Sequence, residues 1–297
     1  MLTEERSLGE GYGTLTSFVL DSAISHEVGA RMRRPAVVIC PGGAFLRLSH
    51  RESEPVAARF LGMGYDAFIC RYPVFDEKDA SREGCFPRTT VSLIRALAYV
   101  KRNASRFSID EDRIYALGFS AGGYVALSVA ELWDDPDLLA MAGATAEEVK
   151  PRGAILAYPM VSVTLAQDAL RKVHDEASAA YARVQSLAIF GHEDPAPEEY
   201  EQLDLVRKVR PDMPRTFIWQ TGEDSTLRVA ETAAFVQKLL LAGVPCEFHL
   251  FQQGMHGMSL ADETSASMPK HENARAAEWV PLVRSWLALD GRPQVVS

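Results

Sequence analysis

Residues 113–124 of this 297-residue chain are Arg-Ile-Tyr-Ala-Leu-Gly-Phe-Ser-Ala-Gly-Gly-Tyr, and they carry the clearest indication of its fold. A short apolar run ends in a Gly-x-Ser-x-Gly turn, and a helical pattern follows up to Ala130. Such a strand–turn–helix unit lifts its serine above a sheet, and glycines are needed where the strained turn passes close to its neighbours. Ser120 would lie at a helix N-terminus, which favours developing negative charge. The alternative is that Ser120 only caps the helix.

Short apolar runs alternate with helical patterns along the rest of the chain. Runs typical of buried strands lie at residues 36–40, 66–72, 153–158, 216–221 and 246–251, and residues 14–21 alternate as an edge strand does. Helical patterns lie at residues 90–103, 229–240 and 279–287, and residues 49–52 have the Ser-x-x-Glu form of a capping box. This alternation predicts an α/β fold with a doubly wound, mostly parallel sheet and helices on both faces.

No linker divides the sequence, so one domain is expected over residues 1–297. The weakest pattern lies at residues 161–214, which are rich in Ala, Gln, Glu and Asp. We interpret this stretch as helices and loops inserted after the fourth buried strand, or as a small cap above the sheet edge.

A serine hydroxyl needs a general base to become a nucleophile near neutral pH. Five histidines follow Ser120, namely His174, His192, His249, His256 and His271. His256 lies in Gly254-Met255-His256-Gly257, just after the run that ends at residue 251, and is the predicted base. His249 lies inside that run and is expected to be structural. His271 lies in a polar stretch and is expected to be solvated.

The histidine needs an acid that holds it in the right tautomer. Asp224 follows the run at residues 216–221, and strand carboxyl ends are where such folds place catalysis. Its neighbour Glu223 is the main competitor, and Asp194 is a more distant alternative. Asp224 would otherwise serve as the N-cap of the helix that follows.

An acyl-transfer site also needs N–H donors for the carbonyl oxygen. Residues 41–45, Pro-Gly-Gly-Ala-Phe, follow the run at residues 36–40, where a glycine-rich loop supplies one donor. The second donor is the N–H of Ala121, next to the serine. Side chains around Phe45 and Phe119 are the predicted substrate contacts.

With these motifs, the chain resembles an α/β-hydrolase of the bacterial acetyl-esterase-like branch, which is related to acetylxylan esterases and BD-FAE-type carbohydrate esterases. The matching segments span most of the chain: residues 41–45, 48–57, 64–65, 71–74, 118–123, the Asp224 turn, 243–245 and 254–257. The resemblance implies the α/β-hydrolase fold and hydrolysis of short acyl esters, often acetyl groups on sugars, without a cofactor. It also implies a triad of Ser120, Asp224 and His256, with Gly43, Ala44 and Ala121 around the oxyanion.

The sequence departs from the family's usual pattern at two places. Ala44 stands where Gly is usual, and its methyl group should narrow the acyl side while leaving the N–H available. Leu227-Arg228 replaces the usual Val-Pro after Asp224, which should reshape that loop.

Composition restricts the partners. The formal charge of −9 argues against nucleic acid, and no stretch reaches 18 apolar residues, so no membrane span is expected. The four cysteines form no C-x-x-C pair, and residues 192–194 lack metal-ligand spacing, so no metal is expected. No signal peptide is visible, which predicts a cytoplasmic enzyme for a small-molecule ester. The sequence does not decide whether the protein forms a homo-oligomer.

The leading interpretation is a serine carboxylesterase with a ping-pong acyl-enzyme mechanism. A serine peptidase of the prolyl-oligopeptidase type is a second possibility, although the chain is too short to include a propeller. A third is a non-catalytic binding protein on a hydrolase fold. Against it, serine, acid and histidine are all present in the expected order.

Overall fold

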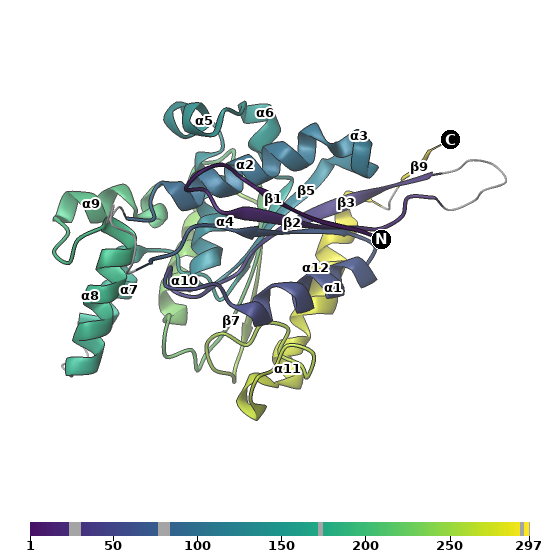
Figure 1. The fold of residues 1–297 in the computed structure, drawn as a ribbon. Coiled ribbons are helices and arrows are strands. Elements are labelled where there is room, and N and C mark those ends of the chain that lie inside the picture. Colours follow the sequence, from purple (N-terminus) through teal and green to yellow (C-terminus); the bar gives the residue numbers. More distant parts are fainter. Residues whose placement is uncertain (24–30, 77–83, 172–174, 292–293, 297) are drawn as a thin grey trace.

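A mostly parallel sheet forms the centre of the molecule in the computed structural model, which describes residues 1–23, 31–76, 84–171, 175–291 and 294–296 (Figure 1). Its strands are β1 (Leu2–Ser7), β2 (Thr14–Val19), β3 (Arg31–Cys40), β4 (Asp66–Arg71), β5 (Ile109–Phe119), β6 (Gly153–Ala157), β7 (Arg215–Thr221) and β8 (Cys246–Phe251). Their spatial order is β1-β2-β4-β3-β5-β6-β7-β8. Neighbours from β4 to β8 are parallel, and β1 and β2 add an antiparallel edge.

The middle of the sheet is buried on both faces, which explains the continuous apolar runs of the sequence. In β3, Ala36, Val38 and Cys40 belong to one core cluster, whereas Val37 and Ile39 belong to the other. All five are fully buried. Successive side chains of a strand point to opposite faces, so a strand between two layers of helices needs apolar residues at every position.

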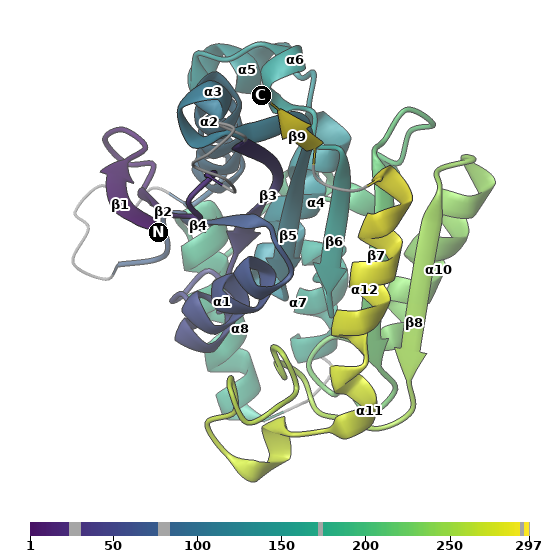
Figure 2. The ribbon, with the colours of Figure 1, turned by 90° about the vertical axis from the view of Figure 1, so that its right-hand side faces the viewer.

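Helices cover both faces of the sheet (Figure 2). The cluster on one face includes residues of α2 (Arg88–Arg102), α4 (Ala121–Leu132) and α10 (Val229–Leu241), and the cluster on the other includes residues of α1 (Glu54–Gly62) and α12 (Trp279–Leu287). Shorter helices are α3 (Ala104–Phe107), α5 (Pro136–Ala142), α6 (Ala146–Val149) and α11 (Ala274–Ala277). The predicted doubly wound α/β fold is confirmed. Within the described ranges, no helix has the length and apolar character needed to cross a bilayer.

Besides a 3₁₀ turn at Leu205–Arg207, the described residues between β6 and β7 form three α-helices. They are α7 (Val163–Arg171), α8 (Glu176–Phe190) and α9 (Pro197–Gln202). Buried side chains join the first two, because Gln167 Nε2 donates to Gln185 Oε1 at 2.8 Å. The Cys85 N–H donates to the Ala188 carbonyl at 2.8 Å, which ties α8 to the segment before α2.

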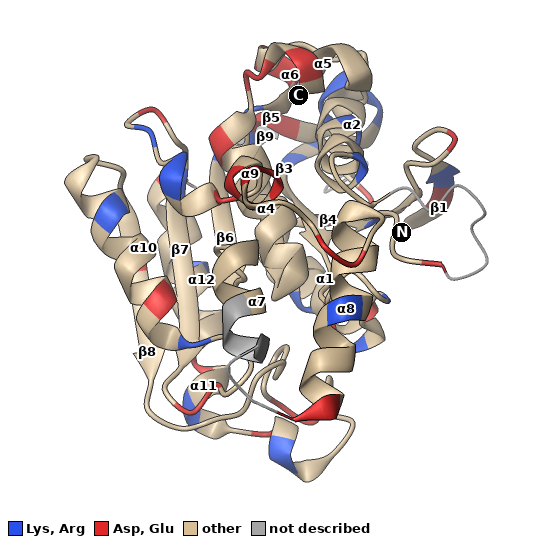
Figure 3. Ribbon diagram, turned by 90° about the vertical axis from the view of Figure 1, so that its left-hand side faces the viewer, with Lys and Arg blue, Asp and Glu red and all other residues tan. Residues whose placement is uncertain are grey.

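The outer parts of the fold differ from the sequence prediction. Strand β1 pairs antiparallel with β2, and β9 (Gln294–Val296) pairs antiparallel with the start of β3. Neither strand was expected, because the burial that marks a strand in sequence is missing in β1, whose residues are nearly all exposed. Short helices α5 and α6 lie beside α2, and Figure 3 shows acidic α6 next to basic α2 residues, where Arg102 and Glu148 pair at 2.6 Å.

The predicted capping box at residues 49–52 is wrong. The Ser49 side chain makes no capping hydrogen bond, and α1 begins only at Glu54, with Pro55 in its first turn. The Glu52 side chain turns inward instead, where it accepts hydrogen bonds from the Gly42 N–H and the Tyr158 hydroxyl.

Asp66, the first residue of β4, is a buried carboxyl with one backbone donor. Its Oδ1 accepts the Leu20 N–H at 2.8 Å, and burial raises its pKa to about 6. The unfolded chain has the ordinary lower pKa, so the folded state holds this proton more tightly. Stability from this group is therefore present at low pH and is lost as the pH rises from about 4 to above 6.

Asp66→Asn should stabilise the protein at pH 8 but not at pH 4.5. The amide keeps an acceptor for Leu20 and carries no charge, and two pKa units correspond to at most about 3 kcal/mol. Urea unfolding at both pH values measures the difference. Glu111→Gln, at an exposed position of β5, is the matched control and should change little at either pH. An equal shift at both pH values for Asp66→Asn would contradict the assignment.

Candidate active site

The turn from β5 into α4 has the close backbone contacts that the sequence predicted. Ser120 stands between Phe119 and Ala121 with φ at +52°, a strained value for a residue with a side chain. A methyl group on Gly118 would lie 2.1 Å from the Gly122 carbonyl oxygen, and one on Gly122 would lie 2.1 Å from the Cys40 carbonyl oxygen. Both positions therefore require glycine, and α4 packs its first turn directly on the end of β3.

A chain of hydrogen bonds runs through Ser120, His256 and Asp224. Ser120 Oγ lies 2.8 Å from His256 Nε2, and His256 Nδ1 lies 2.7 Å from Asp224 Oδ2. Ser120 follows β5, Asp224 follows β7 and His256 follows β8, so all three come from carboxyl ends of parallel strands. The structure thus brings together three residues that lie 104 and 32 positions apart in sequence.

Asp224 is held by its own turn. Its Oδ1 accepts the N–H groups of Thr226 and Leu227, each at 2.9 Å, and its Oδ2 also accepts from Gln220 Nε2 at 3.1 Å. Helix α10 begins at Val229, so the interpretation of Asp224 as the N-cap of that helix is wrong. Leu227, at the position where the family pattern differs, contributes one of these anchoring N–H groups.

The competing acids lie elsewhere. Glu223 Oε2 accepts the Gly254 N–H at 3.1 Å, so this side chain supports the start of the histidine loop and does not contact the imidazole. Asp194 lies exposed between α8 and α9.

The other histidines have partners away from Ser120. His249 in β8 pairs with Glu247 at 2.7 Å, and His192 pairs with Glu199 at 2.9 Å. His271 is buried, which lowers its pKa, and its Nδ1 accepts the Ser267 N–H at 3.3 Å. The expectation that His271 is solvated is therefore wrong. His174 lies outside the described residues.

Free backbone donors surround Ser120. Among the described residues, no hydrogen bond uses the N–H of Gly43, Ala44 or Ala121. The glycine loop has positive φ at Gly43 (133°) and Ala44 (59°). Anchors hold the preceding residues, because the Tyr72 hydroxyl donates to the Pro41 carbonyl at 2.5 Å.

Phe45 and Phe119 are core residues, and we correct their assignment as substrate contacts. Neither ring has exposed surface. Phe45 packs against Phe86 at 5.1 Å between ring centroids, and Phe119 packs against Tyr158 at 5.9 Å. The two rings belong to the core clusters on opposite faces of the sheet. Phe119 is the last residue of the buried strand β5, at the tight turn of residues 118–122, which we call the elbow.

The sequence analysis missed Glu52 and Tyr158. Glu52 is 3% exposed, and its oxygens accept from the Gly42 N–H at 2.8 Å and from the Tyr158 hydroxyl at 2.6 Å. The Tyr158 ring stands edge-on to the His256 ring, with centroids 5.1 Å apart. A glutamate in a Ser-x-x-Glu pattern is typical of a helix capping box. The local sequence therefore does not distinguish a capping glutamate from one that is buried beside the site.

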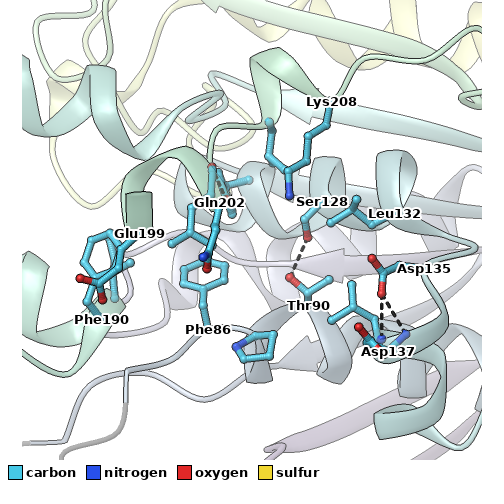
Figure 4. Close-up of a pocket in the computed structure, with 16 residues that line it drawn as sticks. Phe86, Thr90, Ser128, Leu132, Asp135, Asp137, Phe190, Glu199, Gln202 and Lys208 are labelled. Carbon is cyan, nitrogen blue, oxygen red and sulfur yellow. Dashed lines mark hydrogen bonds between the residues drawn. The ribbon is translucent and has the colours of Figure 1, made fainter. Parts of the chain in front are cut away.

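A separate cavity of about 400 Å³ lies along α4 (Figure 4). Tyr124, Ser128 and Leu132 of this helix line it, together with Phe86 and Lys208. A hydrogen bond of 3.0 Å joins Ser128 to Thr90 in its wall. Ser120, Asp224 and His256 do not line this cavity. In the described part of the chain, no group of three or more His, Cys, Asp or Glu side chains is arranged to hold a metal.

Comparison with known families settles the class. Residues 82–260, more than half of the chain, match the family described as alpha/beta hydrolase fold. The chain belongs to the α/β-hydrolase family. It is 27% identical over 238 residues to endo-1,4-beta-xylanase B of Butyrivibrio fibrisolvens, which covers 78% of this chain and 34% of that protein. It is 31% identical over 157 residues to esterase LipU of Mycobacterium tuberculosis, which covers 51% of this chain and 49% of that protein.

Solved structures extend the comparison over nearly the whole chain. The carboxylesterase Cest-2923 from Lactobacillus plantarum superposes with a TM-score of 0.80 at 26% identity, covering 98% of each chain. An acetyl ester-xyloside bifunctional hydrolase from Caldicellulosiruptor lactoaceticus superposes with a TM-score of 0.71 at 26% identity, covering 94% of this chain and 88% of the other. The predicted resemblance to carboxylesterase-type α/β-hydrolases is confirmed. The chain spans a third to a half of the curated relatives described above.

Asp224→Asn should slow phosphonylation of Ser120 by a fluorophosphonate by roughly 10³–10⁴-fold, because an amide stabilises the wrong imidazole tautomer. Glu223→Gln is the matched control and should stay within a few-fold of the wild type, because Glu223 contacts only the Gly254 N–H. The labelling rate, measured by intact-protein mass, decides between them. A loss for Glu223→Gln as large as that for Asp224→Asn would reverse the assignment of the acid.

Proposed function

We propose that this protein is a serine carboxylesterase that hydrolyses short-chain acyl esters through Ser120, His256 and Asp224. The hydrogen-bonded chain from Ser120 Oγ through the imidazole to Asp224 Oδ2, at 2.8 and 2.7 Å, carries the proposal. It supplies a nucleophile, a base and an orienting acid within hydrogen-bond reach, which is what acyl transfer by serine needs.

In the first half of the reaction, Ser120 Oγ attacks the ester carbonyl carbon and its proton passes to His256 Nε2. The Nδ1–H of the imidazole donates to Asp224, so the resulting positive charge lies beside a carboxylate. The carbonyl oxygen becomes an oxyanion, to which the N–H groups of Gly43, Ala44 and Ala121 are free to donate hydrogen bonds. Ala121 is the first residue of α4, where helix N–H groups have no intrahelical partner.

In the second half, His256 gives its proton to the alcohol oxygen, and the alcohol leaves while the acyl group stays on Ser120. A water molecule then loses a proton to His256 and attacks the acyl carbon. The same N–H groups stabilise the second oxyanion. Collapse releases the carboxylic acid and returns the proton to Ser120 Oγ, so each cycle consumes one ester and one water and restores the enzyme.

We propose acetyl as the acyl group and O-acetylated sugars as the substrates. Ala44 carries one of the unused N–H groups, and its methyl group should narrow the space for an acyl chain beside that donor. Among the relatives, one is named a xylanase and one an acetyl ester-xyloside bifunctional hydrolase, so ester and xylose chemistry both occur at this level of similarity.

We also propose that residues 1–297 form one domain in which the stretch 161–214 is a small cap beside the site. The Ala188 carbonyl of α8 accepts the Cys85 N–H at 2.8 Å, and the neighbouring Phe86 ring packs on Phe45 at 5.1 Å between centroids. Helix α8 therefore lies near the loop that carries Ala44. The four cysteines are free thiols, which fits the reducing cytoplasm.

The wild type should hydrolyse p-nitrophenyl acetate fastest, with kcat/KM falling along the series to the decanoate. Ser120→Ala and His256→Ala should each lower kcat by at least about 10⁴-fold, because the two residues act as one unit. His192→Ala, at an exposed position between α8 and α9, is the matched control and should keep wild-type rates. Acetylated xylooligosaccharides should release acetate with the same dependence on Ser120.

Different failures have different meanings. Ester turnover that survives Ser120→Ala would contradict the nucleophile. Hydrolysis of peptidyl p-nitroanilides in preference to esters would favour the peptidase interpretation. A protein that neither hydrolyses esters nor reacts with a fluorophosphonate would be a binding protein on this fold.

A further inference from the structure

One buried carboxylate links the two halves of the site. Glu52 lies in a 3₁₀ turn, His50–Glu52, shortly after the glycine loop, and its side chain is almost fully buried. Oε2 accepts the Gly42 N–H at 2.8 Å, and Oε1 accepts the Tyr158 hydroxyl at 2.6 Å. The first bond fixes the loop that carries the free oxyanion donors, and the second reaches the strand end next to the histidine.

Tyr158 continues the connection to the histidine loop. Its hydroxyl oxygen accepts the Ser259 N–H at 2.8 Å, three residues beyond His256. Its ring stands edge-on to the imidazole at 5.1 Å. The backbone of Tyr158 has a φ of +36°, and its N–H donates to the Trp219 carbonyl at 2.7 Å. Hydrogen bonds therefore fix both the backbone and the hydroxyl group of Tyr158. They hold the residue in a strained backbone conformation, whose cost the surrounding structure must offset.

The donors around Glu52 explain why a carboxylate stands there. The Gly42 N–H can only donate. The Tyr158 oxygen already accepts from Ser259, and its own proton points to Glu52. Two donors that converge in a buried place need a side chain with two acceptor oxygens and no proton. A glutamine offers one acceptor and one donor, so it can satisfy Gly42 only by turning its NH₂ group toward the phenol.

The position of Gly42 gives this network a role in catalysis. A methyl group built on Gly42 would lie 2.8 Å from Glu52 Oε2 and 3.0 Å from Ser120 Cβ. The peptide that Glu52 holds therefore touches the nucleophile and directly precedes Gly43 and Ala44. A displacement of about 1 Å at such a place costs roughly 10²-fold in rate.

We propose that Glu52 is a positioning residue, which through Gly42 and Tyr158 keeps the oxyanion donors and His256 in register with Ser120. This inference rests on the proposed function. It predicts that Glu52 helps to stabilise the tetrahedral intermediate and does not contribute to binding of the ground-state ester. The reason is that Gly43 and Ala44 donate to the oxygen only as its charge develops.

Four variants test the network: Glu52→Ala, Glu52→Gln, Tyr158→Phe and the double variant Glu52→Ala/Tyr158→Phe. We expect kcat for p-nitrophenyl acetate to fall about 10²-fold in Glu52→Ala, with KM changed by less than about 3-fold. Glu52→Gln should recover about tenfold of that loss, because its amide oxygen still accepts the Gly42 N–H. The double variant should be no worse than Glu52→Ala, since both residues belong to one network.

Inhibition by phenylboronic acid, which forms a tetrahedral adduct with a serine, separates positioning from general stability. Its inhibition constant should rise in the variants by the factor by which kcat/KM falls. Glu131→Gln is the matched control: Glu131 is a fully buried carboxyl group in α4 with no hydrogen bond in the described part of the chain, and burial raises its pKa. It should keep kcat within about 2-fold, whatever its effect on Tm.

The inference is overturned if folded Glu52→Ala keeps kcat within about 3-fold, or if its loss lies in KM alone. If Glu52→Ala does not fold, Glu52→Gln and Tyr158→Phe decide, and wild-type kcat in both would refute the network. A loss in Glu131→Gln equal to that in Glu52→Gln would also refute it. Wild-type turnover that depends on Ser120 keeps the proposed function standing in each of these cases, whereas an inactive wild type refutes the function itself.

Discussion

The contact between the elbow and the end of β3 is the constraint on which the site depends. Gly122 meets the Cys40 carbonyl so closely that no side chain fits between them. This contact sets the start of α4, with the unused N–H of Ala121, against the loop at residues 41–45, which carries the unused N–H groups of Gly43 and Ala44. Without it, the strained φ of Ser120 would have no support, and the donors would lie on separate elements.

The inner fold was predictable from sequence because burial leaves a periodic record. The strands between two helical layers, such as β3, are apolar at every position, and this pattern located all six parallel strands. The exposed strand β1 has no such pattern and is held by pairing with β2, a non-local contact that propensity does not encode. The short helices α5 and α6 were missed for a different reason. Segments of four to seven residues are too short to show a helical period in the sequence.

The hydrogen-bonded group of Ser120, His256 and Asp224 was predictable, because each of the three residues follows a buried strand. Chain order and spacing were therefore sufficient to predict that they lie together. Glu52 and His271 were misjudged because both look polar and local in sequence while the structure buries them. A buried polar group is identified by partners that lie far along the chain, as Tyr158 lies 106 positions from Glu52. A single sequence does not show which residues so far apart along the chain are in contact in the fold.

The groups of the proposed site follow β3, β5, β7 and β8, whereas helices α7, α8 and α9 are inserted after β6. The residues of the proposed site and the helices α7, α8 and α9 are thus encoded by different segments of the gene. With residues 161–214 as the proposed cap, insertions, deletions or recombination within this stretch would change what approaches Ser120 without altering the strands that position the proposed triad. Selection for a new alcohol would accordingly act first on this stretch, while the glycines of the elbow stay fixed by backbone contact.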